Sequence, residues 1–241
     1  MATVSTPRRH RPAVNESFAA SVATERGSFC IPTRALTLDG FRDWATSEDF
    51  PQHIRAAFID REVFIDMSNE EPQTHVGVKT EITRVLATLV RDLKMGKFYA
   101  DGLLVSNEDA SVSNNPDALF FTVESLRSGR VRLIAKKDEE DRYREIEGTP
   151  DWVLEVVSDG SVQKDTAKLR EAYHRAGITE YWLIDARGEE IHFQILHHRK
   201  NGYAAASQRD GWQRSRVFGR SFRLDRQRDA LGLWEYTLYR Q

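Results

Sequence analysis

Apolar residues follow a helical period in two parts of the chain. Between residues 72 and 95 they are spaced three or four positions apart, which predicts an amphipathic helix. The apolar positions of this helix are Val78, Ile82, Val85, Leu86, Leu89 and Leu93. The same spacing returns over residues 161–177, where the inner face consists of Leu169, Ala172, Tyr173 and Ala176. Two helices are therefore expected, each with one face against a core.

Short apolar runs bounded by turn residues predict the strands. The run AAFIDREVFIDMS predicts two strands around a tight turn at Asp60 and Arg61. PDALFFTV, PDWVLEVVS and TEYWLIDA each predict another, and the last two flank the second helix, which implies parallel neighbours. From residue 189 onward, alternating residues with KNG and RDG turns predict antiparallel strands. The fold class is thus α/β: a mixed β-sheet flanked by helices, with extra antiparallel strands at both ends.

Two segments depart from these patterns. Residues 1–33 are rich in Ala, Ser, Thr and Arg and have no apolar period, which predicts a flexible N-terminal tail. Residues 127–148 are highly charged and predict an exposed excursion from the fold. A single ordered domain is therefore expected over residues 34–241.

Composition narrows the class of protein. The chain has 241 residues, enough for one core, and 40% of them are hydrophobic and 30% charged, as in soluble globular proteins. No apolar run approaches the roughly 18 residues of a membrane span. The N-terminus lacks the apolar stretch of a signal peptide, and the single cysteine, Cys30, cannot form an internal disulfide. These features favour a cytoplasmic location without a membrane partner.

Positive charge is concentrated in one part of the chain. The net charge is −2, so the chain as a whole lacks the excess of positive charge that is typical of nucleic-acid-binding proteins. Between residues 199 and 228, however, nine Lys and Arg residues are opposed only by Asp210 and Asp225. This segment is either a solvated β-hairpin surface or a flank that faces phosphates. In the second case its contacts to nucleic acid are expected from Arg214, Arg216 and Arg220.

Two acids stand at the strands predicted to form the centre of the sheet. Asp117 follows Pro116 at the start of one run, and Glu155 lies inside the apolar run of another. A carboxylate in an apolar strand is unfavourable unless it is paired or binds a cation. Mg²⁺ accepts one or two carboxylates and keeps several waters, so this pair predicts a Mg²⁺ site, with Mn²⁺ as an alternative. Structural acids with satisfied hydrogen bonds are the other interpretation.

The order of these pieces resembles the Uma-two family of proposed restriction endonucleases, within the PD-(D/E)XK nuclease superfamily. The resemblance covers roughly residues 36–235 and is most specific in the run PDWVLEVVS…AYHRAGITEYWLID. It implies a restriction-endonuclease-like core. Asp117 resembles the acid of the second superfamily motif, and Glu155 resembles the first acid of the third.

The lysine of the superfamily motif has no exact counterpart. Its plainest position, two residues after the acid, is Val157, and the position that the family uses, four residues before the tyrosine, is Leu169. Lys168 is adjacent to Leu169, and Lys164 lies one turn earlier. Both are candidates for the catalytic lysine, since a long side chain reaches inward from a helix flank.

Three further residues are candidates for the same site. Glu81 lies beside the apolar stripe of the first helix and is either a third metal ligand or a solvated acid. His75 opens that helix and is either a residue next to the metal ligands or a structural hydrogen-bonding residue. Asp151 shares a strand face with Glu155 and is either a neighbour of the site or a turn acid.

Three functions are compatible with these observations. The first is a divalent-metal-dependent endonuclease that hydrolyses phosphodiester bonds, with DNA as the expected substrate and a homodimer as the expected assembly. The second is a nucleic-acid-binding protein of the same fold that has lost the catalytic lysine. The third is a homo-oligomeric interaction protein, suggested by aromatic residues near the C-terminus that are expected to be exposed, namely Trp212, Phe222, Trp234 and Tyr236.

Overall fold

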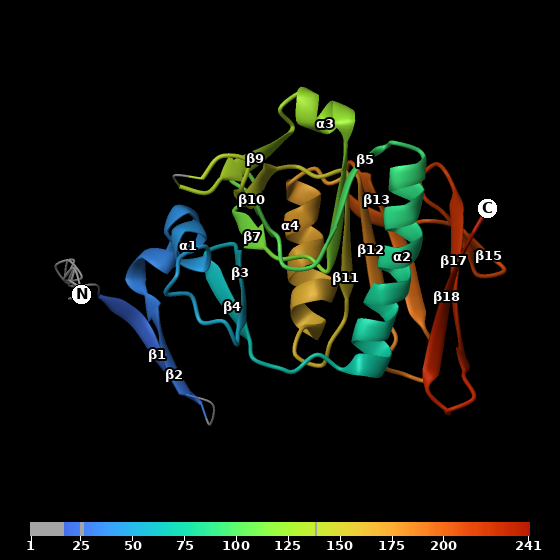
Figure 1. The fold of residues 1–241 in the computed structure, drawn as a ribbon, viewed down its shortest axis with the longest axis horizontal. Coiled ribbons are helices and arrows are strands. Elements are labelled where there is room, and N and C mark those ends of the chain that lie inside the picture. The colour runs from blue at the N-terminus through green and yellow to red at the C-terminus, as the bar shows by residue number, and fades with distance from the viewer. Residues whose placement is uncertain (1–16, 25–26, 138) are drawn as a thin grey trace, which may run out of the picture.

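The computed structural model describes residues 17–24, 27–137 and 139–241. Its centre is a six-stranded mixed sheet with the order β14-β13-β12-β11-β8-β5 (Figure 1). The bounds are β5 Gly96–Ala100, β8 Ala118–Thr122, β11 Trp152–Val156, β12 Glu180–Asp185, β13 His192–Arg199 and β14 Gly202–Ala205. Strands β11 and β12 are parallel neighbours joined through helix α4 (Leu169–Arg175), as expected, and the other neighbouring pairs are antiparallel.

Strand β11 is buried along its whole length because both faces of the sheet are covered. Its side chains alternate between two cores. Val153 packs with α4 and with a second sheet, whereas Leu154 packs with helix α2 (Gly77–Asp92). This explains why PDWVLEVVS is almost continuously apolar, and it makes Glu155 an exception on the α4 face.

The second sheet is also six-stranded, with the order β4-β3-β7-β6-β10-β9. The bounds are β3 Arg55–Ile59, β4 Glu62–Asp66, β6 Leu104–Asn107, β7 Val112–Asn114, β9 Val131–Ala135 and β10 Tyr143–Gly148. The hairpin expected around Asp60 and Arg61 is β3–β4, and both turn residues have positive φ. The expected exposed excursion is right only in part: residues 127–130, 135–137 and 140–143 are exposed, but β9 and β10, which follow the short helix α3 (Val123–Arg127), pair within this sheet, and Val131, Glu145 and Ile146 are buried.

A buried ion pair explains how the charged strand β10 joins a sheet. Glu145 is fully buried, and Arg42 of helix α1 (Leu38–Ala45) binds it through Nε at 2.8 Å and Nη2 at 3.1 Å. The pair is bidentate, which is the favourable geometry for a carboxylate and a guanidinium. The partner of Glu145 lies about 100 residues away in sequence, so the local charge pattern of residues 127–148 gives no sign of it.

We expect Arg42→Ala to lower the free energy of unfolding by about 3–5 kcal/mol, because it leaves the Glu145 carboxylate buried without its cation. Chemical denaturation monitored by fluorescence measures this change. The control is Arg91→Ala, since Arg91 is exposed on α2 and pairs only with its neighbour Asp92. Equal stabilities of the two variants would contradict the role of the pair.

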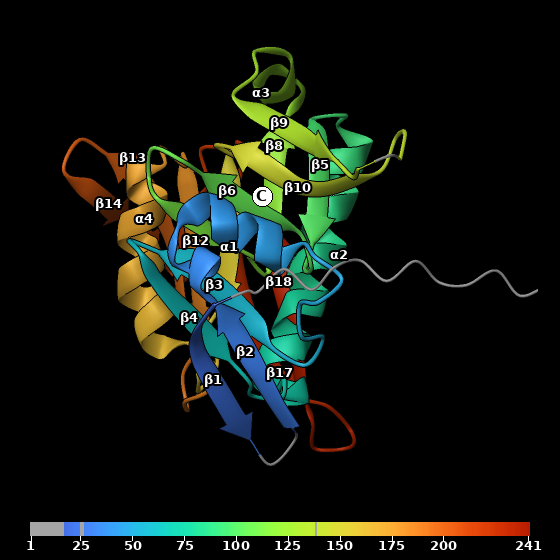
Figure 2. The same ribbon diagram turned by 90° about the vertical axis from the view of Figure 1, so that its left-hand side faces the viewer.

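The described N-terminal residues form a hairpin. Strands β1 (Phe18–Thr24) and β2 (Gly27–Pro32) pair, followed by the 3₁₀ turn η1 (Thr33–Leu36). Figure 2 shows the hairpin and α1 in front of the second sheet, where Phe29 and Trp44 join a third core. Residues 18–24 and 27–32, expected in the tail, are thus strands, and residues 1–16 lie outside the described residues.

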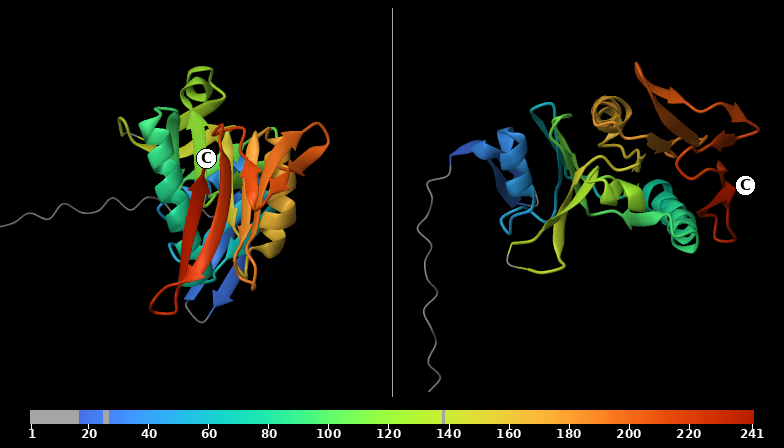
Figure 3. Two further views of the ribbon diagram at one scale, coloured as in Figure 1. Left: turned by 90° about the vertical axis from the view of Figure 1, so that its right-hand side faces the viewer. Right: turned by 90° about the horizontal axis from the view of Figure 1, so that it is seen from above.

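The C-terminal strands form a four-stranded antiparallel sheet with the order β15-β16-β17-β18. The bounds are β15 Gln208–Arg209, β16 Trp212–Arg214, β17 Ser221–Arg228 and β18 Trp234–Arg240. Figure 3 shows helix α2 between this sheet and the central one. The expected α/β architecture, with antiparallel strands toward both ends, is confirmed. In the part of the chain that the structure describes, no helix combines the length and apolarity that a membrane crossing requires.

Candidate active site

The register of the central sheet brings Asp117 and Glu155 together. Leu154 pairs with Ala118 between antiparallel strands β11 and β8, so the next step opposes Glu155 and Asp117. Directly opposed residues of antiparallel strands project to the same face. Both side chains line one pocket between the central sheet, the β3–β4 hairpin and the start of α4. Its cavity volume of about 80 Å³ holds several water-sized groups.

Asp117 is held by the backbone of the neighbouring strand. Its Oδ2 accepts a hydrogen bond from the Val156 N–H at 2.7 Å. Its Oδ1 lies 3.3 Å from Lys79 Nζ, and Oδ2 lies 3.7 Å from His75 Nε2. The carboxylate is therefore fixed at the pocket wall beside two nitrogen groups of the helix that begins there.

Glu155 is only 2% exposed. Its Oε1 accepts hydrogen bonds from the Tyr173 hydroxyl at 2.6 Å and from Asn114 Nδ2 at 2.9 Å. Its Oε2 lies 3.9 Å from Lys164 Nζ. Burial raises the pKa of Glu155 well above its ordinary value, and the charge of Lys164 offsets only part of that effect. Glu155 is therefore a carboxyl group whose charged form needs a cation.

Lys164 supplies positive charge to this pocket. Its Nζ lies 2.9 Å from Asp165 Oδ1, and both residues line the pocket. Burial alone would lower the pKa of Lys164, but the charges of Glu155 and Asp165 outweigh it and raise that pKa above its ordinary value. Lys164 is thus a cation that stabilises negative charge, not a base that takes up protons.

Two π-helical turns shape the pocket. In the turn η3 (Lys164–Lys168) the Leu169 N–H bonds the Lys164 carbonyl, five residues back, and in η2 (Pro72–Val76) the Gly77 N–H bonds the Pro72 carbonyl. The wider turn shifts the phase of the side chains relative to an α-helix, and such turns are frequent at functional sites. One turn delivers Lys164, and the other delivers His75, which is 4% exposed and lines the pocket.

Lys79 is a residue of this region that the sequence analysis missed. It projects from α2 and is 8% exposed, with Nζ 2.8 Å from both Glu70 and Asp101. Burial would lower the pKa of Lys79, but the charge of Asp117 and the bonds to Asp101 and Glu70 raise it. The available signal was its position three residues before Ile82, on the buried stripe of the helix.

Three other candidates are not brought to the pocket. Lys168 pairs with Glu62 at 2.8 Å on the outer side of the β3–β4 hairpin. Glu81 faces the C-terminal sheet, where it accepts the Leu238 N–H at 2.9 Å and pairs with Arg84. Asp151 accepts bonds from the Thr122 N–H and the Ser125 hydroxyl, both at 2.7 Å, which is the arrangement of a structural turn acid.

The basic segment lies at the other end of the central sheet. Glu180, opposite Trp152 in the register, accepts the backbone N–H of Arg216 at 2.8 Å. Arg214 and Arg220 flank this contact, since Ser215 N–H bonds the Arg220 carbonyl at 2.8 Å. Trp152 is the first residue of β11, whereas Glu155 lies near the other end of the same strand. The three arginines therefore lie at the end of the strand away from Glu155, and none of them lines the pocket.

The pocket has the donor set of a two-carboxylate cation site. Within residues 17–24, 27–137 and 139–241, no group of three or more His, Cys, Asp and Glu side chains forms a ready-made metal cage. Mg²⁺ does not require one, because it is commonly bound by one or two carboxylates together with waters and substrate phosphates. Asp117 and Glu155 fit that pattern.

The fold has a restriction-endonuclease-like core, and comparison with known proteins agrees. Residues 38–227 match the Uma2 family, described as "Putative restriction endonuclease", so the chain belongs to this family. A solved structure described as a putative nuclease belonging to DUF820, from Anabaena variabilis ATCC 29413, shares the fold. Its TM-score is 0.55 and its identity 17%, over 76% of this chain and 90% of that one. No curated protein matches the chain.

Proposed function

We propose that this protein is a divalent-metal-dependent endonuclease that hydrolyses phosphodiester bonds in DNA. The observation that carries the proposal is that Asp117, which precedes β8, and Glu155 of the neighbouring strand β11 line one pocket together with Lys164. Family membership supports a nuclease and therefore a nucleic acid substrate. DNA, the metal requirement and the catalytic residues are our proposals.

In this proposal Asp117 and Glu155 hold Mg²⁺ or Mn²⁺. When bound, the cation neutralises charge on the scissile phosphate and lowers the pKa of a coordinated water. Asp117 is oriented by the Val156 N–H, and Glu155 presents Oε2 toward Lys164. Lys164, a half-buried cation in the pocket, stabilises the negative charge that develops on the phosphoryl oxygens. Lys79, with Nζ 3.3 Å from Oδ1, pairs with Asp117, and His75 lies beside the same carboxylate.

The direct test is incubation of the purified protein with supercoiled plasmid in EDTA, in Mg²⁺ and in Mn²⁺. We expect nicked and linear products only with a metal ion, and none with the double variant Asp117→Ala/Glu155→Ala. Single-stranded RNA of matched length serves as the competing substrate. Cleavage in EDTA, or cleavage that survives in the double variant, would contradict the metal site.

We expect the affinity for Mn²⁺ to rise with pH, because a proton on Glu155 competes with the cation. The raised pKa of Glu155 means that its ionisation continues at pH values above 4.5. Affinity should therefore increase by up to about tenfold per pH unit below that pKa and level off above it. Isothermal titration calorimetry between about pH 5.5 and about pH 8.5 covers this range. An affinity independent of pH would show that Glu155 is not a ligand.

The structure weakens the arguments for the two alternative functions, the binding protein without catalysis and the interaction protein. A binding protein without catalysis was suggested by the missing lysine, and Lys164 now lies in the pocket. The interaction protein was suggested by four aromatics expected to be exposed, of which Phe222 and Tyr236 are buried and Trp212 and Trp234 are half-buried. The plasmid assay separates catalysis from binding alone.

We further propose that the endonuclease acts as a homodimer in the cytoplasm. Two active sites allow both strands of a duplex to be cut, and the single cysteine suits a reducing compartment. Sedimentation equilibrium at micromolar concentration tests the dimer. Salt-dependent DNA binding tests the basic segment, with Arg214, Arg216 and Arg220 each expected to reduce the salt slope by about one when replaced.

A further inference from the structure

A closed set of three hydrogen bonds joins Tyr173, Asn114 and Glu155. We propose that Tyr173 and Asn114 are positioning residues: they hold the Glu155 carboxylate by Oε1 and leave Oε2 for a divalent cation. This inference rests on the proposed function and deepens it, because it names the groups that fix the geometry of the metal ligand.

The direction of each hydrogen bond follows from the chemistry of the donors. Asn114 Nδ2 donates to Glu155 Oε1 at 2.9 Å and to the Tyr173 hydroxyl oxygen at 2.8 Å. Because the hydroxyl oxygen accepts from Asn114, its own proton is directed at Glu155 Oε1, 2.6 Å away. Oε1 thus accepts two bonds, and rotation of the carboxylate would break both of them.

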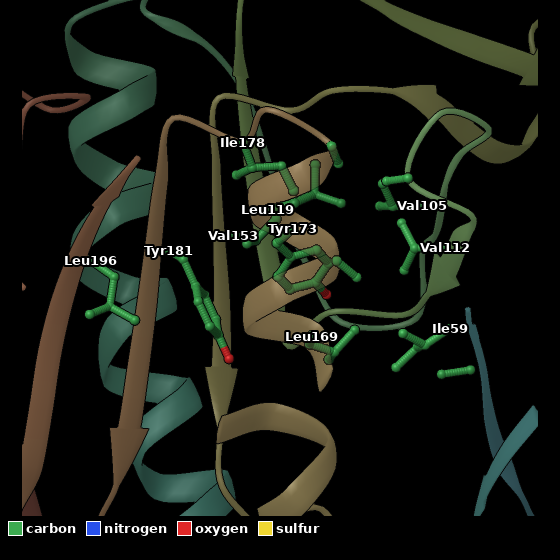
Figure 4. Close-up of a cluster of buried hydrophobic side chains, with 14 of the residues drawn as sticks. Ile59, Val105, Val112, Leu119, Val153, Leu169, Tyr173, Ile178, Tyr181 and Leu196 are labelled. Atoms are coloured by element: carbon green, nitrogen blue, oxygen red, sulfur yellow. The ribbon is translucent and has the colours of Figure 1, made fainter. Parts of the chain in front are cut away.

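The set is shielded from water, which strengthens each bond. Asn114 is 3% exposed, and Tyr173 and Glu155 are 2% exposed. Figure 4 shows Tyr173 on α4 amid Leu119, Val153 and Leu169. Burial and the charge of Glu155 raise the pKa of Tyr173 well above its ordinary value, so the hydroxyl keeps its proton and remains a donor.

A second tyrosine of the same core provides the comparison that separates positioning from packing. Tyr181 is also fully buried, and its ring contacts that of Tyr173 with 5.4 Å between centroids. Its hydroxyl donates to the backbone carbonyl of Asp165 at 2.9 Å and not to a carboxylate. Tyr173→Phe and Tyr181→Phe each remove one buried hydroxyl, but only the first removes a bond to the proposed metal ligand.

The experiment measures Mn²⁺ affinity by electron paramagnetic resonance of the free ion, together with thermal unfolding and plasmid cleavage, in the wild type and both variants. We expect Tyr173→Phe to weaken Mn²⁺ binding about tenfold, because partners of a ligand typically change metal affinity by 10–100-fold. Saturating Mn²⁺ should restore part of its kcat, and KM for DNA should not change. Tyr181→Phe should bind Mn²⁺ as the wild type does.

Asn114→Ala gives an independent test if Tyr173→Phe does not fold. Its control is Asn107→Ala, since Asn107 is also buried but bonds the Gly148 carbonyl and the Ala110 N–H. Wild-type Mn²⁺ affinity in both Tyr173→Phe and Asn114→Ala would overturn the positioning role and leave the proposed function intact. A wild-type protein that neither binds Mn²⁺ nor cuts DNA would overturn both.

Discussion

Glu155→Gln and Asp117→Asn are each expected to reduce the kcat for plasmid cleavage by about a thousandfold, equivalent to about 4 kcal/mol in the activation barrier. Each change keeps the shape of the side chain but removes the negative charge that would hold the cation. In Glu155→Gln the amide oxygen still accepts from Tyr173 and Asn114, so the fold should persist. Initial rates under saturating Mg²⁺ measure the effect.

The matched controls are buried acids outside the pocket. Asp151→Asn repeats the substitution at the other Pro-Asp pair, where the carboxylate bonds Thr122 and Ser125. Glu180→Gln removes a fully buried charge from the neighbouring strand β12. Both controls are expected to lower stability and to leave kcat within about twofold of the wild type. Equal losses of kcat at all four positions would point to folding defects and contradict the special role of Asp117 and Glu155.

Lys164→Ala is expected to lower kcat by about 10²–10³-fold, because it removes the half-buried cation beside Glu155. The control is Lys168→Ala on the same helical turn, since Lys168 pairs with Glu62 outside the pocket. It should retain wild-type kcat. The opposite order, with loss in Lys168→Ala and activity in Lys164→Ala, would show that the functional lysine is the one nearest to the family position.

Lys79→Ala tests whether Lys79 and Lys164 have different roles. Lys79 lies 3.3 Å from Asp117 and 2.8 Å from Asp101, so its removal should affect the Asp117 side of the pocket first. A variant with altered Mn²⁺ affinity and little change in kcat at saturating metal would distinguish this orienting role from that of Lys164.

The acids of the site could be predicted because their signal is local. Glu155 interrupts an apolar strand, and Asp117 opens the neighbouring strand, so period-two alternation and strand order suffice to bring them together. The fold class and the parallel pairing around the second helix followed from the same kind of pattern. The structure places both acids in the lining of one pocket and pairs β11 with β12 in parallel.

The lysine could not be chosen from spacing, because spacing assumes an α-helix. The π-helical turn η3 shifts the phase between Lys164 and Leu169, so the residue that reaches the pocket is not adjacent to the family position. The sequence also favoured Glu81 as a site residue and gave no role to Lys79, whereas the structure places Lys79 beside Asp117 and Glu81 beside Leu238. They are two residues apart on α2 and face different sides, and the deciding partners, Leu238 and Asp117, come from distant strands.

Long-range pairing also explains why part of residues 127–148 is buried although the segment was expected to be exposed. The charge of Glu145 looks incompatible with burial until Arg42, from a helix about 100 residues earlier, is included. The aromatic residues near the C-terminus were expected to be exposed for the converse reason, because the segments that cover them are distant in sequence: α2 packs on β18, which carries Tyr236, and Trp182 of β12 contacts Phe222 with 5.0 Å between ring centroids.

The most direct measurement of the central proposal is anomalous diffraction from crystals soaked in Mn²⁺. We expect one strong peak in the pocket, roughly 2.1 Å from an oxygen of Asp117 and from Oε2 of Glu155. We also expect the peak to vanish in crystals of Glu155→Gln. A Mn²⁺ ion bound elsewhere in a crystal of protein that cuts DNA would contradict the assignment of these two carboxylates.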